Sequence, residues 1–139
     1  MHELGLRLAA VLRAGDLLVL TGALGAGKTT LTRGIGEGLG AMGTVSSPTF
    51  VIARTHQTNS NTNLVHVDAY RLGSVHEFDD LDIDLDNSVV VVEWGRGFAE
   101  DLTDDWLDIE IERAKTSDDE MRTVTIETHG SRWNGVIFE

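Results

Sequence analysis

The chain of 139 residues contains no cysteine, which excludes a disulfide framework and a metal site built from thiolates. No apolar run approaches the roughly 18 residues that a membrane-spanning helix needs, and the first residues lack the pattern of a secretory signal. We therefore expect a cytoplasmic protein that does not contact a membrane. The length favours a single domain over residues 1–139, with about the last ten residues forming a loose tail.

Basic residues are also scarce, because 11 lysines and arginines stand against 23 aspartates and glutamates, for a formal net charge of −12. The 11 basic residues form no run. A chain with this balance is repelled by the phosphates of nucleic acid. We expect no direct binding to nucleic acid by the isolated chain.

Glycine, in contrast, is abundant, and it is arranged in a motif. Residues 22–29 read Gly-Ala-Leu-Gly-Ala-Gly-Lys-Thr, which is G-x-x-x-x-G-K-T, the phosphate-binding loop called the P-loop. An apolar run at 16–21 predicts a strand before the motif, and 29–39 predicts a helix after it that ends at Gly40. A glycine-rich turn that happens to precede Lys-Thr is the alternative, and the strand and helix around the motif argue against it.

Each part of the motif has a chemical reason. Backbone N–H groups of the loop and of the helix N-terminus point toward one phosphate site. The Lys28 ammonium reaches the β- and γ-phosphates, and the Thr29 hydroxyl holds Mg²⁺. The predicted cofactors are ATP and Mg²⁺, and the expected nucleotide-binding residues are Leu24, Gly25, Ala26, Gly27, Lys28, Thr29 and Thr30.

The rest of the chain predicts a small α/β protein with the P-loop NTPase fold. We expect strands at 50–55, 64–68, 88–94, 107–112 and 122–128, and helices from residue 4 to about 14 and within 75–85. The alternation in the last two strands predicts a half-exposed antiparallel ribbon. The architecture is then a mixed central sheet flanked by helices, with the antiparallel ribbon at its C-terminal end.

Two apolar strands end in a carboxylate, at Asp68 and Glu93. Ligands of open α/β sheets bind beyond the carboxyl ends of the strands. One carboxylate can hold the metal or its waters while the other orients the attacking water. The alternative for each is an ordinary exposed acid at a strand end, and the sequence leaves open which of the two contacts the metal.

Three further features carry weaker signals. Thr49, within the segment 46–50, either senses the γ-phosphate or belongs to an ordinary turn. Trp94 either stacks on a partner or fills the core, and the residues alone favour the core. His66 alternates with valines, which favours a residue on a strand face over a metal ligand.

Four segments occur together in order: G-A-G-K-T-T-L-T-R-G at 25–34, S-P-T-F at 47–50, D-A-Y-R-L at 68–72 and V-E-W at 92–94. This combination resembles the TsaE family over roughly residues 4–126. The resemblance implies a cytoplasmic ATPase of bacterial tRNA modification, which acts with TsaB and TsaD to install threonylcarbamoyl on adenosine 37 of tRNAs that read codons starting with A. It also implies that hydrolysis is slow without those partners.

The resemblance also implies roles by position. Lys28, Asp68 and Glu93 match the catalytic residues, and Thr29 and Glu93 match the metal-binding pair. The switch-like or partner-facing residues are Ser47, Pro48, Thr49, Phe50, Tyr70, Arg71 and Trp94. The chain departs from the family pattern at Gly95, where a proline is usual, and before the first helix, where members usually have a strand and a polar turn that helps to hold the base.

Other functions compete with this interpretation. A small P-loop kinase of a metabolite or nucleoside is the main alternative, although 139 residues leave little room for its arginine-rich lid. A GTPase is unsupported because no Asn-Lys-x-Asp motif reads guanine. A nucleotide-gated binding module with negligible hydrolysis differs from the ATPase only in degree.

Overall fold

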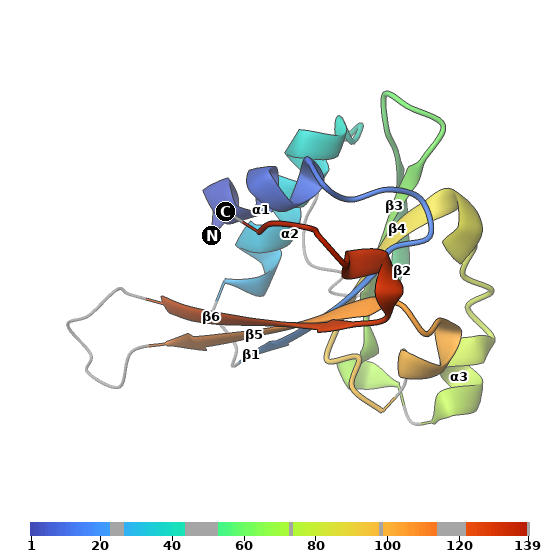
Figure 1. Ribbon diagram of the computed structural model, residues 1–139. Helices are drawn as coiled ribbons and strands as arrows, with labels where there is room; N and C mark the ends of the chain where they lie inside the picture. Colours follow the sequence, from blue (N-terminus) through green and yellow to red (C-terminus); the bar gives the residue numbers. More distant parts are fainter. Residues whose placement is uncertain (23–26, 44–52, 73, 98, 114–121, 139) are drawn as a thin grey trace.

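The structure is a computed structural model that describes residues 1–22, 27–43, 53–72, 74–97, 99–113 and 122–138. The chain forms a six-stranded mixed sheet with the order β2-β3-β4-β1-β5-β6 (Figure 1). The strands are β1 (Leu17–Gly22), β2 (Ala53–Gln57), β3 (Asn63–Asp68), β4 (Ser88–Glu93), β5 (Trp106–Arg113) and β6 (Arg122–His129). The neighbouring strands β3, β4, β1 and β5 run parallel, whereas β2 and β6 pair antiparallel at the two edges. The expected α/β class and antiparallel C-terminal ribbon are therefore confirmed.

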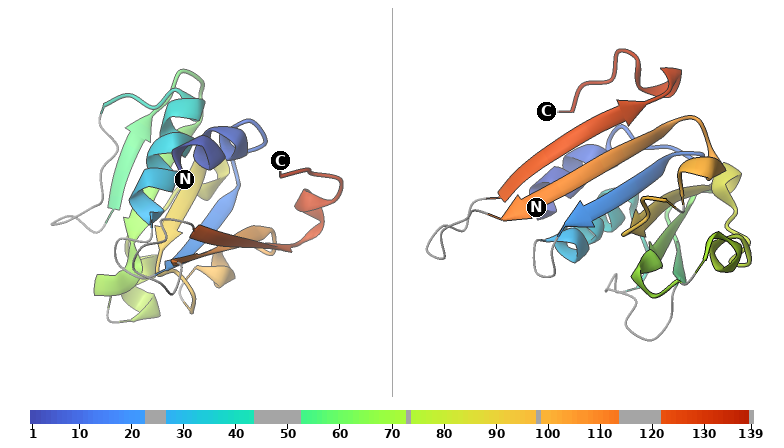
Figure 2. Two further views of the ribbon diagram at one scale, coloured as in Figure 1. Left: turned by 90° about the vertical axis from the view of Figure 1, so that its left-hand side faces the viewer. Right: turned by 90° about the horizontal axis from the view of Figure 1, so that it is seen from below.

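Two helices cover one face of the sheet and a shorter one lies toward the other (Figures 1 and 2). Helices α1 (His2–Ala9) and α2 (Lys28–Leu39) pack closely together. Glycines permit this approach, because a Cβ on Gly5 would lie 2.7 Å from the backbone nitrogen of Ile35. Helix α3 (Val75–Asp79) contributes the buried Phe78 on the opposite side.

Short 3-10 helices complete the described elements. They are η1 (Ala69–Arg71), η2 (Leu85–Asn87), η3 (Glu100–Leu102) and η4 (Ser131–Trp133). No helix of the described residues is both long enough and apolar enough to cross a membrane.

The alternation of side chains along β1 divides the core into two layers. Leu18 and Leu20 pack with residues of α1 and α2, whereas Leu17 and Val19 pack on the α3 side. All four are fully buried, and each such side chain contributes about 1.5–3 kcal/mol through burial. Burial on both faces explains the continuous valine run in β4, as expected for a parallel sheet.

Some element boundaries differ from the sequence prediction. The first helix ends at Ala9 instead of near residue 14, and β2 begins at Ala53, so residues 50–52 of the expected strand lie outside the described residues. The stretch 75–85 contains only the short α3, with η2 beginning at Leu85. Strand β5 has the expected alternation, because Leu107, Ile109 and Ile111 are buried against the helix layer, whereas Glu110 is half-buried and Glu112 is exposed.

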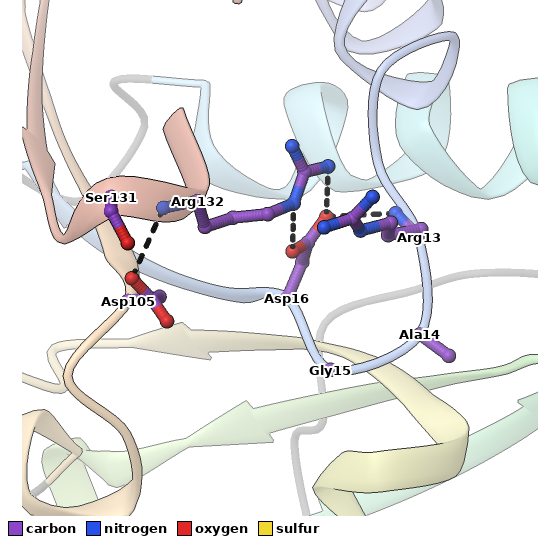
Figure 3. A pocket seen from close by; sticks show the side chains of 7 residues that line it. All are labelled: Arg13, Ala14, Gly15, Asp16, Asp105, Ser131 and Arg132. Carbon is purple, nitrogen blue, oxygen red and sulfur yellow. Dashed lines mark hydrogen bonds and ion pairs between the residues drawn. The ribbon is translucent and has the colours of Figure 1, made fainter. Parts of the chain in front are cut away.

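The C-terminal residues, expected to form a loose tail, pack against the body of the protein. Trp133 is buried in the helix-side layer. The guanidinium of Arg132 donates to both carboxylate oxygens of Asp16 at 3.0 Å (Figure 3). It also donates to the carbonyl of Val11 at 2.7 Å. These contacts join the end of the chain to the start of β1, which periodicity alone does not reveal.

A polar pocket lies at this junction and is lined by Arg13, Ala14, Gly15, Asp16, Asp105, Ser131 and Arg132. Asp16 and Asp105 come just before β1 and β5, so the pocket lies at the amino ends of the parallel strands. Its carboxylates already accept hydrogen bonds from backbone and guanidinium groups around it. The pocket is therefore a polar junction of the fold, at the opposite end of the strands from the P-loop.

Candidate functional site

The two strand-end carboxylates lie side by side at the carboxyl edge of the sheet. Asp68 and Glu93 are register partners in the parallel pair of β3 and β4, and Glu93 is the register partner of Leu20 in β1. The strand β1 continues to Gly22, where the P-loop begins. The topology thus brings both predicted carboxylates next to the predicted phosphate loop.

Lys28 is the first residue of α2 and lies over this edge. Its ammonium donates a 2.5 Å hydrogen bond to the carbonyl of Gly22, and the residue is only 6% exposed. Burial lowers the pKa of Lys28 below its usual value, while the charges of Glu93 and Asp68 act in the opposite direction. The site is therefore a partly dehydrated cluster of one cation and two carboxylates.

The start of α2 has the features of an anion-binding helix end. Gly27 precedes the helix with φ of 114°, a left-handed conformation that favours glycine. The first turn carries no acidic residue, so the partial positive charge of the helix N-terminus is not neutralised there. Thr29 is half-buried in this turn and Thr30 is exposed. The predicted phosphate-binding residues Leu24, Gly25 and Ala26 lie outside the described residues.

Glu93 is held by a histidine that the sequence did not identify as a site residue. Its Oε2 atom lies 2.6 Å from Nε2 of His66, and both side chains are buried. Since His66 reaches across from the adjacent strand, it is a strand-face residue as expected, but its partner is a site carboxylate. The signal in the sequence was a polar residue within an apolar strand, two positions before Asp68.

Asp68 is oriented by the backbone that follows it. Its Oδ1 atom accepts a 3.0 Å hydrogen bond from the N–H of Tyr70, which caps the short helix η1. The cap fixes the carboxylate at the end of β3, so Asp68 has both a structural contact and a place in the site.

Trp94 lies at the rim of the site, beside Lys28. The residue is half-buried, and its ring centroid is 4.7 Å from Nζ of Lys28. Its φ of 60° is left-handed, and its N–H donates to the carbonyl of Leu20 at 2.8 Å. The exposed Tyr70 ring lies 5.6 Å from it between centroids. Arg71 belongs to η1, while Ser47, Pro48, Thr49 and Phe50 lie outside the described residues.

Gly95 and Arg96 anchor the segment that follows Trp94. A Cβ on Gly95 would come within 2.7 Å of the Val92 side chain, so the backbone packs tightly here. The Arg96 guanidinium forms ion pairs with Asp108 at 3.0 Å and Glu110 at 3.3 Å on β5. The hydrogen bond to Asp108 raises the pKa of Arg96. This network ties the loop after β4 to the sheet.

The donor set fits magnesium bound together with a polyphosphate. A hydroxyl at Thr29 and a carboxylate at Glu93 are oxygen donors, and Mg²⁺ usually combines one or two carboxylates with phosphate oxygens and waters. Among the described residues, no group of three or more histidines, aspartates or glutamates could hold a metal alone.

The protein has the P-loop NTPase fold of nucleotide-binding proteins. This class is defined by a strand, a glycine-rich loop and a helix that begins with lysine, with carboxylates at the ends of neighbouring strands. The crystal structure of YdiB from Bacillus subtilis has the same fold, with a TM-score of 0.74 and 34% identity over 96% of this chain and 81% of that one. The sequence model of the family "Threonylcarbamoyl adenosine biosynthesis protein TsaE" matches residues 1–124. The chain belongs to the TsaE family.

Curated relatives agree with this assignment. The tRNA threonylcarbamoyladenosine biosynthesis protein TsaE of Streptomyces coelicolor is 59% identical, over 96% of this chain and 93% of its own. The TsaE proteins of Mycobacterium tuberculosis and Bacillus subtilis are 46% and 41% identical, covering 86% and 94% of this chain and 77% and 81% of theirs.

Proposed function

We propose that this protein binds and hydrolyses ATP with Mg²⁺ as the TsaE component of tRNA threonylcarbamoyladenosine biosynthesis. One observation carries the proposal: the Lys28 ammonium and the carboxylates of Asp68 and Glu93 meet at the start of α2. The family and the names of its members connect this site to the modification of tRNA.

The polyphosphate binds to the N-terminus of α2 and to Lys28. For this, the ammonium exchanges the Gly22 carbonyl for phosphate oxygens, and the low solvent exposure of Lys28 strengthens the new charge interaction. The backbone amides of 24–30 complete the phosphate site. Burial lowers the pKa of Lys28, and a bound phosphate anion would offset this effect because its negative charge favours the charged ammonium.

Thr29 and Glu93 hold the metal. When bound, Mg²⁺ neutralises part of the charge that develops on the phosphate oxygens during transfer to water. Asp68 orients the attacking water through its carboxylate, whose Oδ1 atom accepts the hydrogen bond of the Tyr70 N–H. Lys28, Asp68 and Glu93 are the proposed catalytic residues.

The partners proposed for the chain are TsaB and TsaD, in the cytoplasm. The proposed docking surface comprises Tyr70, Arg71 and Trp94, and Trp94 lies beside Lys28. Residues 47–50, which lie outside the described residues, are proposed as partner-facing from the resemblance alone. The exposure of Tyr70 and its contact with Trp94 support this placement. The net charge of −12 supports a role in which the chain does not contact tRNA directly. Hydrolysis is slow until these partners complete the site.

The proposal is tested by mixing the chain with TsaB and TsaD and measuring both phosphate release from ATP and modification of tRNA. Wild type is compared with Glu93→Gln and with the matched control Glu127→Gln, whose side chain is exposed on β6. We expect both activities for wild type and the control, and loss of both in Glu93→Gln. Transfer of phosphate to a metabolite instead of water would contradict the proposal and favour the kinase.

A further inference from the structure

The bond between His66 and Glu93 fixes which histidine nitrogen carries a proton. A carboxylate only accepts hydrogen bonds, so Nε2 of His66 donates to Oε2 of Glu93 at 2.6 Å. The other nitrogen, Nδ1, is buried and has no hydrogen-bond partner among the described residues. The histidine therefore directs its one bonded N–H at a single atom of the site.

The surroundings leave this pair little freedom. His66 is fully buried and Glu93 is 5% exposed, in the layer between the sheet and α2. Neighbours of His66 along the same face of the sheet include the buried Leu64 and Val91. A buried carboxylate without a donor would bear a desolvation cost, and the cation that acts on it electrostatically is Lys28. Without His66, the Glu93 carboxylate loses the hydrogen bond that sets its orientation.

We propose that His66 is a positioning residue that holds the Glu93 carboxylate in the orientation in which it binds the metal. By occupying Oε2, it leaves Oε1 for the cation. The inference rests on the proposed function, because it assigns His66 to the same site. Hydrogen-bonded partners of metal-binding groups typically contribute about 10–100-fold to metal affinity or activity.

The experiment compares three substitutions at His66. His66→Phe keeps a ring of similar size and removes the donor. His66→Gln places an amide N–H near the position of Nε2, while His66→Asn places its amide too far back to reach Glu93. The matched control is His56→Phe, because His56 is also buried but contacts the carbonyl of Met42, away from the site.

The primary measurement is the affinity for ATP by calorimetry, in EDTA and at increasing Mg²⁺ concentrations, with thermal unfolding of the nucleotide-free proteins alongside. For His66→Phe we expect ATP affinity in EDTA within about twofold of wild type and the Mg²⁺-dependent gain in affinity reduced about tenfold or more. His66→Gln should recover most of the gain, and His66→Asn should not. His56→Phe should keep the full gain, whatever its stability.

The hydrolysis assay with partner subunits provides a second measurement. We expect His66→Phe to lower kcat by about 10–100-fold with little change in KM for ATP. A His66→Phe protein with the wild-type Mg²⁺ gain and kcat would overturn the inference while leaving the proposed function intact. Equal defects in His66→Gln and His66→Phe would also overturn it. A wild-type protein that neither binds ATP nor responds to Mg²⁺ would overturn the proposed function itself.

Discussion

The ammonium of Lys28 lies 4.7 Å from the ring centroid of Trp94, a residue whose backbone is held in the left-handed region with φ of 60°. A non-glycine residue rarely adopts this conformation without a cause, and the hydrogen bond from Trp94 N–H to Leu20 holds it there. The P-loop lysine and an aromatic ring at the proposed docking surface are therefore in direct contact. When the phosphates of a bound nucleotide attract the Lys28 ammonium, the surroundings of Trp94 therefore change.

This contact predicts that Trp94→Ala weakens binding of TsaB and TsaD more than it weakens binding of ATP. The ring lies beside the exposed Tyr70, so its removal alters the proposed docking surface. Pull-down of the partners with and without ATP measures the first effect, and calorimetry measures the second.

Isolated wild-type chain should not retain tRNA at physiological salt, given its charge of −12. Tight tRNA binding by the isolated chain would mean that the class of partner is wrong.

Conservative substitution of the carboxylates should separate binding from turnover. Asp68→Asn and Glu93→Gln keep the shape of each side chain but remove its charge, so we expect ATP hydrolysis with partners to fall by about 10²-fold or more. Asp101→Asn and Glu127→Gln serve as controls, since both residues are exposed on the surface. Normal hydrolysis by both site variants would reduce the two carboxylates to structural strand-end acids.

The lowered pKa of Lys28 predicts how stability depends on pH. Between the lowered pKa of the folded protein and the usual 10.5 of the unfolded chain, the unfolded state binds more protons. The lysine contribution to stability therefore rises as pH increases through this window. Urea unfolding of wild type and Lys28→Met at a series of alkaline pH values measures the difference. A difference in unfolding free energy that stays constant, or falls with rising pH, would contradict the assignment.

The Arg132–Asp16 pair predicts that removing Arg132 lowers the stability of the fold without changing the affinity for ATP. Asp16 is 3% exposed, and Arg132→Ala would leave its carboxylate buried, with the Arg13 backbone N–H as its remaining donor among the described residues. Loss of one partner of a buried pair costs about 3–5 kcal/mol. Arg7→Ala, at an exposed position in α1, is the control. We expect a lower urea midpoint for Arg132→Ala only, with ATP affinity unchanged where the protein is folded. An unchanged midpoint would show that the C-terminal contact is dispensable.

Much of this site follows from local patterns in the sequence. The motif that contains Lys28 and the apolar strands ending at Asp68 and Glu93 define the elements, and parallel pairing then requires the strand ends to meet. The bond between His66 and Glu93 could not be predicted, because it depends on the register of neighbouring strands. The contact of Arg132 with Asp16 spans most of the chain and leaves no local periodicity. The position of Trp94 depends on an unusual backbone angle that its sequence neighbours do not dictate.

The central claim is that Lys28 completes a site for the phosphates of ATP. Calorimetric titration of Mg²⁺ and ATP into wild type and Lys28→Ala tests it most directly, with circular dichroism on the same samples to verify the fold. We expect wild type to bind ATP clearly and Lys28→Ala to lose productive binding while it retains its fold. Equal affinity and equal hydrolysis in the two proteins would contradict it.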